Sequence, residues 1–221
     1  MMIAFVGSGG KTTLLKKMAA DFRGQGKSVF VTTTTHMFIE EDTLLTDDAE
    51  KIIRALRETG YAMAGVPEGE KIKALSRKTF DSVCANADIV LVEADGSRQL
   101  PLKYPGNMEP VIPEGVDEIV VVCGLNAIGQ KAKDVCHRLE LVRACLGIDG
   151  DTVITASLVQ KLVTEGYLKP LGRNYPNARI TLRPRHDGSP RQRAIASLLQ
   201  NGQDVSVVQK DCFCPPELWE A

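Results

Sequence analysis

The sequence has few aromatic residues, no excess of charge of either sign and no long hydrophobic run. Aromatic residues make up only 5% of the 221 residues, so a nucleic-acid or carbohydrate platform of stacked rings is not expected. Lysine and arginine number 27, aspartate and glutamate number 28, and the net charge of −1 provides no basic field for a polyanion. Nucleic acid is therefore not predicted as a partner.

The cysteines and the N-terminus exclude further classes. The six cysteines show no spacing typical of a disulfide framework. The apolar run Ile3 to Val6 is too short to span a membrane, and it lacks the basic lead and cleavage site of a signal peptide. We therefore expect a soluble, cytoplasmic protein without a membrane partner. Cys212 and Cys214 could offer two thiolates to a soft metal, but no second pair at zinc-finger spacing supports such a site.

Apolar, β-rich segments alternate with helical patterns along the chain. The segments expected as strands are 2–6, 28–32, 61–65, 89–92, 119–123, 179–182 and 205–208. Helices are expected over 12–23, from a cap at Asp47 to Thr59, over 76–86, from a cap at Thr155 to about Gly166, and over 190–202. This alternation predicts an α/β fold in three layers, with a mostly parallel sheet of about seven strands and helices on both faces.

The strongest functional signal is a glycine-rich loop that follows the first strand and precedes the first helix. Glycines let the backbone turn its N–H groups towards an anion, and the helix N-terminus adds partial positive charge. Lys11 could reach the β- and γ-phosphates of a nucleotide, and the Thr12 hydroxyl could bind Mg²⁺. The residues expected to hold the phosphates are Gly7, Ser8, Gly9, Gly10, Lys11, Thr12 and Thr13. The spacing G-x-x-G-K-T is shorter than the usual phosphate loop and is similar to that of the Mur ligases.

An acid pair at the end of a buried strand is the expected partner of this loop. Ligands of open α/β sheets bind beyond the carboxyl ends of the strands, where Glu93 and Asp95 follow the run 89–92. Alternation along an extended strand would place both side chains on one side. We expect the two acids to contact Mg²⁺ and to orient a water molecule or a substrate hydroxyl, unless they are two solvated acids in a turn.

Other polar clusters carry weaker signals. Thr34, Thr35 and His36 follow the second strand and could form a switch towards Mg²⁺ or the γ-phosphate, although threonines are also ordinary strand residues. Residues 94–115 are irregular and proline-rich, and a long loop of this kind is usually functional or mobile. Residues 40–50 hold six acids and no bases, whereas 167–193 hold seven bases and one acid. Such runs are usually solvated faces, but the basic run could border an anionic ligand.

Several segments together resemble one protein family, the YqeC family. Its members are called selenium-dependent hydroxylase accessory proteins or selenium cofactor biosynthesis proteins. The resemblance extends from residue 2 to about residue 200, and the block 93–113 is more specific than the phosphate loop alone. The segments that carry it are VGSGGKTTLL, VTTTTHM, VEADGSRQLPLKYPGNMEPVIP, VVCGLNAIG and CHRLE.

The resemblance implies a single P-loop nucleotide-binding domain over 1–221 that takes Mg²⁺ with ATP or GTP. It adds a set of switch or substrate residues: Thr35, His36, Arg98, Lys103, Glu109, His137 and Arg138. Arg98 and Lys103 would face a phosphate or an acidic substrate. Members of the family tend to have an Asn-Lys-x-Asp-like sequence near residue 180. Here only Asp187 remains as a base contact, so guanine specificity is weakened and ATP is slightly favoured.

Four functions remain open from the sequence. The first is a Mg²⁺-dependent NTPase or phosphotransferase that assists maturation of selenium-dependent molybdenum hydroxylases, with the hydroxylase or its maturation proteins as partners. The second is a nucleotide-gated chaperone that delivers a cofactor to the apo-hydroxylase with little turnover. The third is a Mur-ligase-like enzyme that forms an acyl-phosphate, which the lack of a separate substrate domain opposes. The fourth, a nucleic-acid binder using 167–193, is opposed by charge and composition.

Overall fold

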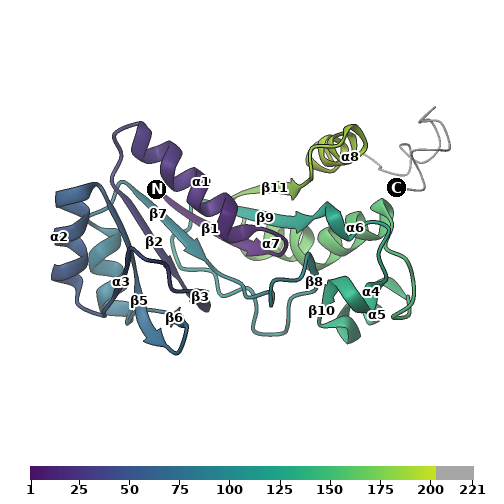
Figure 1. Ribbon diagram of the computed structural model, residues 1–221, viewed down its shortest axis with the longest axis horizontal. Coiled ribbons are helices and arrows are strands. Elements are labelled where there is room, and N and C mark those ends of the chain that lie inside the picture. Colours follow the sequence, from purple (N-terminus) through teal and green to yellow (C-terminus); the bar gives the residue numbers. More distant parts are fainter. Residues whose placement is uncertain (203–221) are drawn as a thin grey trace.

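The computed structural model describes residues 1–202, and its core is a mostly parallel sheet (Figure 1). The parallel strands of this part are β1 (Met2–Gly7), β2 (Val29–Thr33), β4 (Thr43–Leu45), β5 (Tyr61–Glu68), β7 (Ile89–Glu93), β9 (Glu118–Gly124) and β11 (Arg179–Arg185). Their order across the sheet is β11–β9–β1–β7–β2–β5–β4. Two antiparallel strands, β6 (Lys71–Lys73) and β3 (His36–Phe38), extend it from β5. The predicted α/β fold is therefore confirmed.

Helices cover both faces of this sheet. Their bounds are α1 (Lys11–Gly24), α2 (Ala49–Thr59), α3 (Arg77–Cys84), α4 (Ala132–Val135), α5 (Leu139–Leu146), α6 (Ala156–Val163), α7 (Lys169–Asn174) and α8 (Pro190–Gln200). Helix α1 packs on one face, in a core with alternate residues of β1, β2, β7 and β9. On the other face, α2 and α3 share one core and α5 to α8 share another. None of the helices in residues 1–202 is long and apolar enough to cross a membrane.

Strand β1 shows why the phosphate loop has a fixed starting point. Ile3 and Phe5 point into the core beneath α1, whereas Ala4 and Val6 point into the core on the opposite face. All four side chains are fully buried, because β1 is flanked by the parallel strands β7 and β9. A shift of β1 by one residue would exchange its two faces, so the register of the loop that follows is set by packing.

The cap of α2 differs from the prediction by one residue. Asp48, not Asp47, is the N-cap, and its side chain accepts hydrogen bonds from the N–H groups of Glu50 and Lys51. The Asp47 carboxylate instead accepts a bond from the N–H of Ser76, at the start of α3. Gly60 ends α2 in the left-handed conformation, with φ of 71°, as the sequence predicts.

The helix predicted to end near Gly166 continues beyond it. After α6 the chain forms a π-helical turn, η2 (Thr164–Leu168), and then α7. A Cβ atom at Gly166 would lie 3.2 Å from side-chain atoms of Tyr104 and Pro105. The glycine therefore permits a close approach of the segment 94–115 and is not a helix stop.

The predicted irregular segment 94–115 contains one short strand. This strand, β8 (Leu102–Lys103), pairs in parallel with β10 (Cys136–His137) in a separate two-stranded sheet. The second sheet lies with α4 and α5 at one end of the molecule, beyond the phosphate loop (Figure 1). Its register places Lys103 beside His137. The predicted strand 205–208, Cys212 and Cys214 lie outside the described residues.

Candidate functional site

The loop between β1 and α1 is held by backbone contacts that require glycine. Gly7, Gly9 and Gly10 have φ angles of 88°, 81° and 109°. A Cβ atom at Gly7 would overlap the carbonyl oxygen of Val122, and one at Gly9 would lie 2.6 Å from the nitrogen of Gly124. Both neighbours belong to β9, so the loop packs directly against the end of the adjacent strand.

We predict that Gly7→Ala destabilises the protein by about 1–3 kcal/mol, because the new methyl group would meet β9 in a disfavoured backbone conformation. Chemical denaturation would measure the change in the free energy of unfolding. Gly24→Ala is the matched control, since that glycine ends α1 with open space around it. Equal stability of the two variants would contradict the packing described for the loop.

The loop leaves its amide groups available at the start of α1. The first backbone bond into the helix runs from the N–H of Leu14 to the oxygen of Gly10, so the preceding N–H groups have no partner within the helix. No side chain caps α1. Arg185, at the end of β11, adds a cation: its Nε lies 3.3 Å from the position of a Cβ on Gly10. This end of α1 is therefore suited to an anion.

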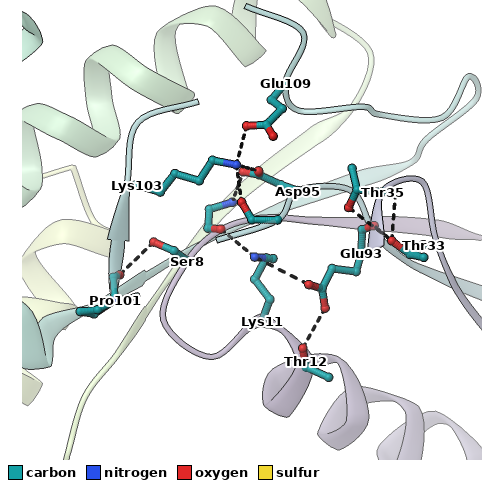
Figure 2. Close-up of polar contacts among 12 residues, drawn as sticks. Ser8, Lys11, Thr12, Thr33, Thr35, Glu93, Asp95, Pro101, Lys103 and Glu109 are labelled. Atoms are coloured by element: carbon teal, nitrogen blue, oxygen red, sulfur yellow. Dashed lines mark hydrogen bonds and ion pairs between the residues drawn. The ribbon is translucent and has the colours of Figure 1, made fainter. Parts of the chain in front are cut away.

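Lys11, Thr12 and Glu93 form a compact cluster at the mouth of the loop (Figure 2). The Nζ of Lys11 donates to the carbonyl oxygen of Gly7 at 2.8 Å and lies 3.8 Å from Oε1 of Glu93. The hydroxyl of Thr12 donates to Oε2 of Glu93 at 2.8 Å. The predicted partnership between the loop and the acid on β7 is therefore present in the geometry.

Burial disfavours the charged forms of both Lys11 and Glu93. The two side chains are only 3% and 9% exposed. Burial lowers the pKa of Lys11, although the charge of Glu93 opposes the shift, and burial raises the pKa of Glu93 against the opposing charge of Lys11. The pair therefore stabilises each charge incompletely. An anion beside Lys11 and a cation beside Glu93 would supply the missing compensation.

Asp95 lies beneath the loop and does not line the cleft. Its carboxylate is fully buried and accepts bonds from the N–H of Gly7 at 3.1 Å and from the hydroxyl of Tyr167 at 2.8 Å. Lys103 also donates to it. Because these donors occupy the carboxylate, its position does not match the predicted contact with Mg²⁺ or water. It holds the start of the loop instead.

Lys103 likewise faces the interior, whereas the family resemblance implied that it faces a phosphate or an acidic substrate. Its Nζ lies between the carboxylates of Asp95 and Glu109, as Figure 2 shows. Glu109 in turn accepts two 2.9 Å contacts from the guanidinium of Arg138. Burial alone would raise the pKa of Glu109, but Lys103, the N–H of Gly106 and Arg138 hold it below its usual value. We call the linked side chains of Asp95, Lys103, Glu109 and Arg138 the buried charge chain.

An open cleft of about 910 Å³ lies above this chain and beside the phosphate loop. Most of the predicted site residues line it: Gly9, Gly10, Lys11, Thr12, Thr13, Thr35, His36, Glu93, Arg98, Glu109, His137 and Arg138. The others do not, namely Gly7, Ser8, Thr34, Asp95, Lys103 and Asp187. Ser8 is buried, and its hydroxyl donates to the carbonyl oxygen of Pro101 at 2.9 Å (Figure 2).

The threonine cluster after β2 separates into three roles. Thr33 donates to the carbonyl oxygen of Glu93 at 2.7 Å and accepts from the N–H of Thr35, so it fixes the end of β2 against β7. Thr34 does not face the cleft as a switch residue would, because its hydroxyl donates to the carbonyl oxygen of Val111 at 2.6 Å. Thr35 and His36 do line the cleft, and Nε2 of His36 lies 2.7 Å from Glu68.

The structure adds cleft residues that the sequence did not single out. Lys71 and Phe38 lie on the antiparallel strands β6 and β3, with Nζ of Lys71 4.7 Å from the ring centre of Phe38. Gly69, in the turn that joins β5 to β6, was the one available sequence signal for these strands, because glycine favours turns. It adopts a φ of 63° there. Asp187 lies outside the lining, and its carboxylate accepts a bond from the N–H of Ser189 before α8. A base contact by Asp187 stays a prediction.

The donors present suit Mg²⁺ better than a metal held by protein ligands alone. Within residues 1–202, no group of three or more histidine, cysteine, aspartate or glutamate side chains is placed to hold a metal ion. Mg²⁺ typically takes one or two protein oxygens and completes its shell with phosphates and water. Glu93 and Thr12 are oxygen donors of this kind, next to the loop.

The strand, glycine-rich loop, helix and acid-bearing neighbouring strand define an α/β protein of the phosphate-loop class. The profile of the YqeC protein family matches residues 3–140, a span that includes the loop, Glu93 and the buried charge chain. The chain therefore belongs to the YqeC family. The YqeC protein of Escherichia coli strain K12 is 29% identical over 171 residues, which are 73% of this chain and 67% of that protein.

A solved structure similar to this chain comes from the MinC:MinD cell division protein complex of Aquifex aeolicus. The likeness covers 95% of this chain and 89% of that one, at 13% identity and a TM-score of 0.35, which is too low to characterise the site. The family and the geometry of the loop together support a nucleotide-binding protein.

Proposed function

We propose that this protein binds a nucleoside triphosphate with Mg²⁺ and hydrolyses it or transfers its terminal phosphoryl group. The observation that carries the proposal is the contact between Thr12 and Glu93 at the mouth of a glycine-rich loop that also presents Lys11. The loop amides and Lys11 would bind the phosphates, and Thr12 and Glu93 would hold Mg²⁺. Bound Mg²⁺ would neutralise charge on the phosphates.

Within this proposal, Asp95 is a positioning residue. It binds the N–H of Gly7 and is itself held by Tyr167 and Lys103, so it fixes the backbone from which the loop begins. Burial, together with the charge of Asp95, raises the pKa of Tyr167 well above its usual value, so the phenol stays protonated and remains a donor. The role of orienting an attacking group then passes to residues that line the cleft.

The Thr12 hydroxyl provides a sharp test. We expect Thr12→Val to bind Mg²⁺-nucleotide at least about tenfold more weakly than the wild type, because the hydroxyl that would contact the metal is lost. Thr12→Ser keeps the hydroxyl and should restore most of the affinity. Isothermal titration with ATP and GTP, with and without Mg²⁺, would measure both. Equal affinity of the valine and serine variants for Mg²⁺-nucleotide would contradict the proposed metal contact.

The family resemblance suggests the cellular setting. We propose that the nucleotide chemistry serves maturation of selenium-dependent molybdenum hydroxylases, as the naming of the family implies. ATP is favoured only slightly over GTP, because the chain lacks the Asn-Lys-x-Asp-like sequence.

A second candidate, a nucleotide-gated adaptor for an apo-hydroxylase, is supported by one contact. The hydroxyl of Thr34 joins the segment after β2 to Val111 in the proline-rich segment 94–115. A movement of the segment after β2 on nucleotide binding would therefore be passed to the proline-rich segment. That segment carries Met108, which is 86% exposed and could contact a partner protein. Nucleotide-dependent capture of the hydroxylase, with negligible turnover by the free protein, would favour the adaptor over the enzyme.

A further inference from the structure

In the described residues, the non-glycine residues with a left-handed backbone conformation all lie at one cleft. Arg98, Gln99 and Arg138 are the residues other than glycine in 1–202 that adopt positive φ, at 49°, 64° and 59°. All three line the cleft beside the phosphate loop. This conformation costs a residue with a side chain roughly 1–2 kcal/mol, so it persists only where the surroundings impose it. Strain of this kind is concentrated at binding sites.

The cations that line this part of the cleft or lie beneath it differ in how they are paired. Arg138 makes two contacts of 2.9 Å with Glu109, and Lys103 is enclosed between Asp95 and Glu109. Arg98 has no hydrogen bond or ion pair within residues 1–202, and its exposed side chain lines the cleft. The Arg98 guanidinium therefore retains its full capacity to bind an oxyanion in the two-pronged geometry that arginine favours.

His137 supplies a second unused group at the same place. Its Nδ1 is buried without a hydrogen-bond partner, and the side chain lines the cleft. Burial and the charges of Lys103, Arg138 and Arg98 lower the pKa of this histidine, and Glu109 opposes them. The ring is therefore neutral at neutral pH and can donate one N–H bond. Its surroundings carry a surplus of positive charge.

We propose that Arg98 and His137 form a subsite for the oxyanion, a carboxylate or a phosphate, of a second substrate. The subsite deepens the proposed function, because a second substrate presupposes a nucleotide at the loop. Both residues line the same cleft as Lys11 and Thr12, so an acceptor anchored here would share one cavity with the transferable phosphoryl group. The buried charge chain holds the wall in place, and Gly106 leaves room for the Arg138 guanidinium.

The test isolates this subsite from the phosphate loop. In a Lys11→Ala background, binding of inorganic phosphate and of malonate would be measured by titration calorimetry. Arg98→Gly removes the guanidinium and suits the positive φ, so it should fold; Arg98→Gln is the second variant. Arg54→Gln, an exposed arginine on α2, is the matched control. We expect either Arg98 variant to weaken anion binding about tenfold or more, and the control to leave it unchanged.

The outcomes separate the subsite from the proposed function. Loss of phosphate binding alone in the Arg98 variants supports a phosphorylated substrate, and loss of malonate binding alone supports a carboxylate. Anion binding that does not depend on Arg98 overturns the subsite, even if the wild type binds Mg²⁺-nucleotide. If the wild type binds no nucleotide but phosphate or malonate binding still requires Arg98, the proposed function fails and the subsite stands.

Discussion

Lys11→Ala is expected to lose measurable nucleotide binding or, at minimum, about 10²–10³-fold in turnover. In the structure, Lys11 is buried beside Glu93, and its Nζ is held at the loop by the carbonyl oxygen of Gly7. Removing the ammonium would take away the cation that the phosphate loop itself offers to the phosphates. It would also leave the Glu93 carboxylate without the positive charge that opposes its raised pKa.

The control for this variant is Lys17→Ala. Lys17 is an exposed lysine on the same helix, outside the lining of the cleft, so its removal changes the net charge equally without changing the site. Binding of Mg²⁺-ATP and Mg²⁺-GTP and release of phosphate would be measured for both. If the two variants behaved alike, Lys11 would have no specific role at the phosphates.

Lys103→Met is expected to lower the free energy of unfolding by about 3–5 kcal/mol. Lys103 is fully buried, and its removal would leave the carboxylates of Asp95 and Glu109 without their shared cation. A buried charge without a partner costs more than a lost surface contact. Denaturant unfolding would measure the effect, and nucleotide binding should weaken as well, because Asp95 positions Gly7.

Two comparisons make this prediction specific. Lys133→Met removes an exposed lysine paired with Asp151 at 2.8 Å and should change stability by no more than about 1 kcal/mol. The double variant Lys103→Met with Asp95→Asn should recover part of the loss, since one uncompensated charge is removed with its partner. A Lys103 variant as stable as the Lys133 variant would show that the buried charge chain contributes little.

The sequence predicts the phosphate loop well because all of its signals are local. A buried apolar strand, closely spaced glycines and an amphipathic helix lie within the first 24 residues, and the structure has β1, the loop and α1 there. The acid on β7 follows from a general rule, since parallel strands carry ligands at their carboxyl ends. Glu93 accordingly lies beside Thr12 although they are 81 positions apart in the chain.

The roles of Asp95 and Lys103 could not be predicted in the same way. Both are charged residues near a strand end, and side chains of this kind are usually exposed. Their burial depends on one another, on Glu109 and on Tyr167, which lies 72 positions from Asp95. No local pattern indicates such a pairing. The same limit applies to β3 and β6, because strands of only three residues are too short to show an alternating pattern.

Titration of the wild-type protein with Mg²⁺-ATP and Mg²⁺-GTP is the most direct test that the loop is a nucleotide site. We predict saturable binding of at least one of them at one site per chain, with an affinity that falls when Mg²⁺ is chelated. The absence of binding to either nucleotide, with or without Mg²⁺, in a folded preparation would contradict the proposed function.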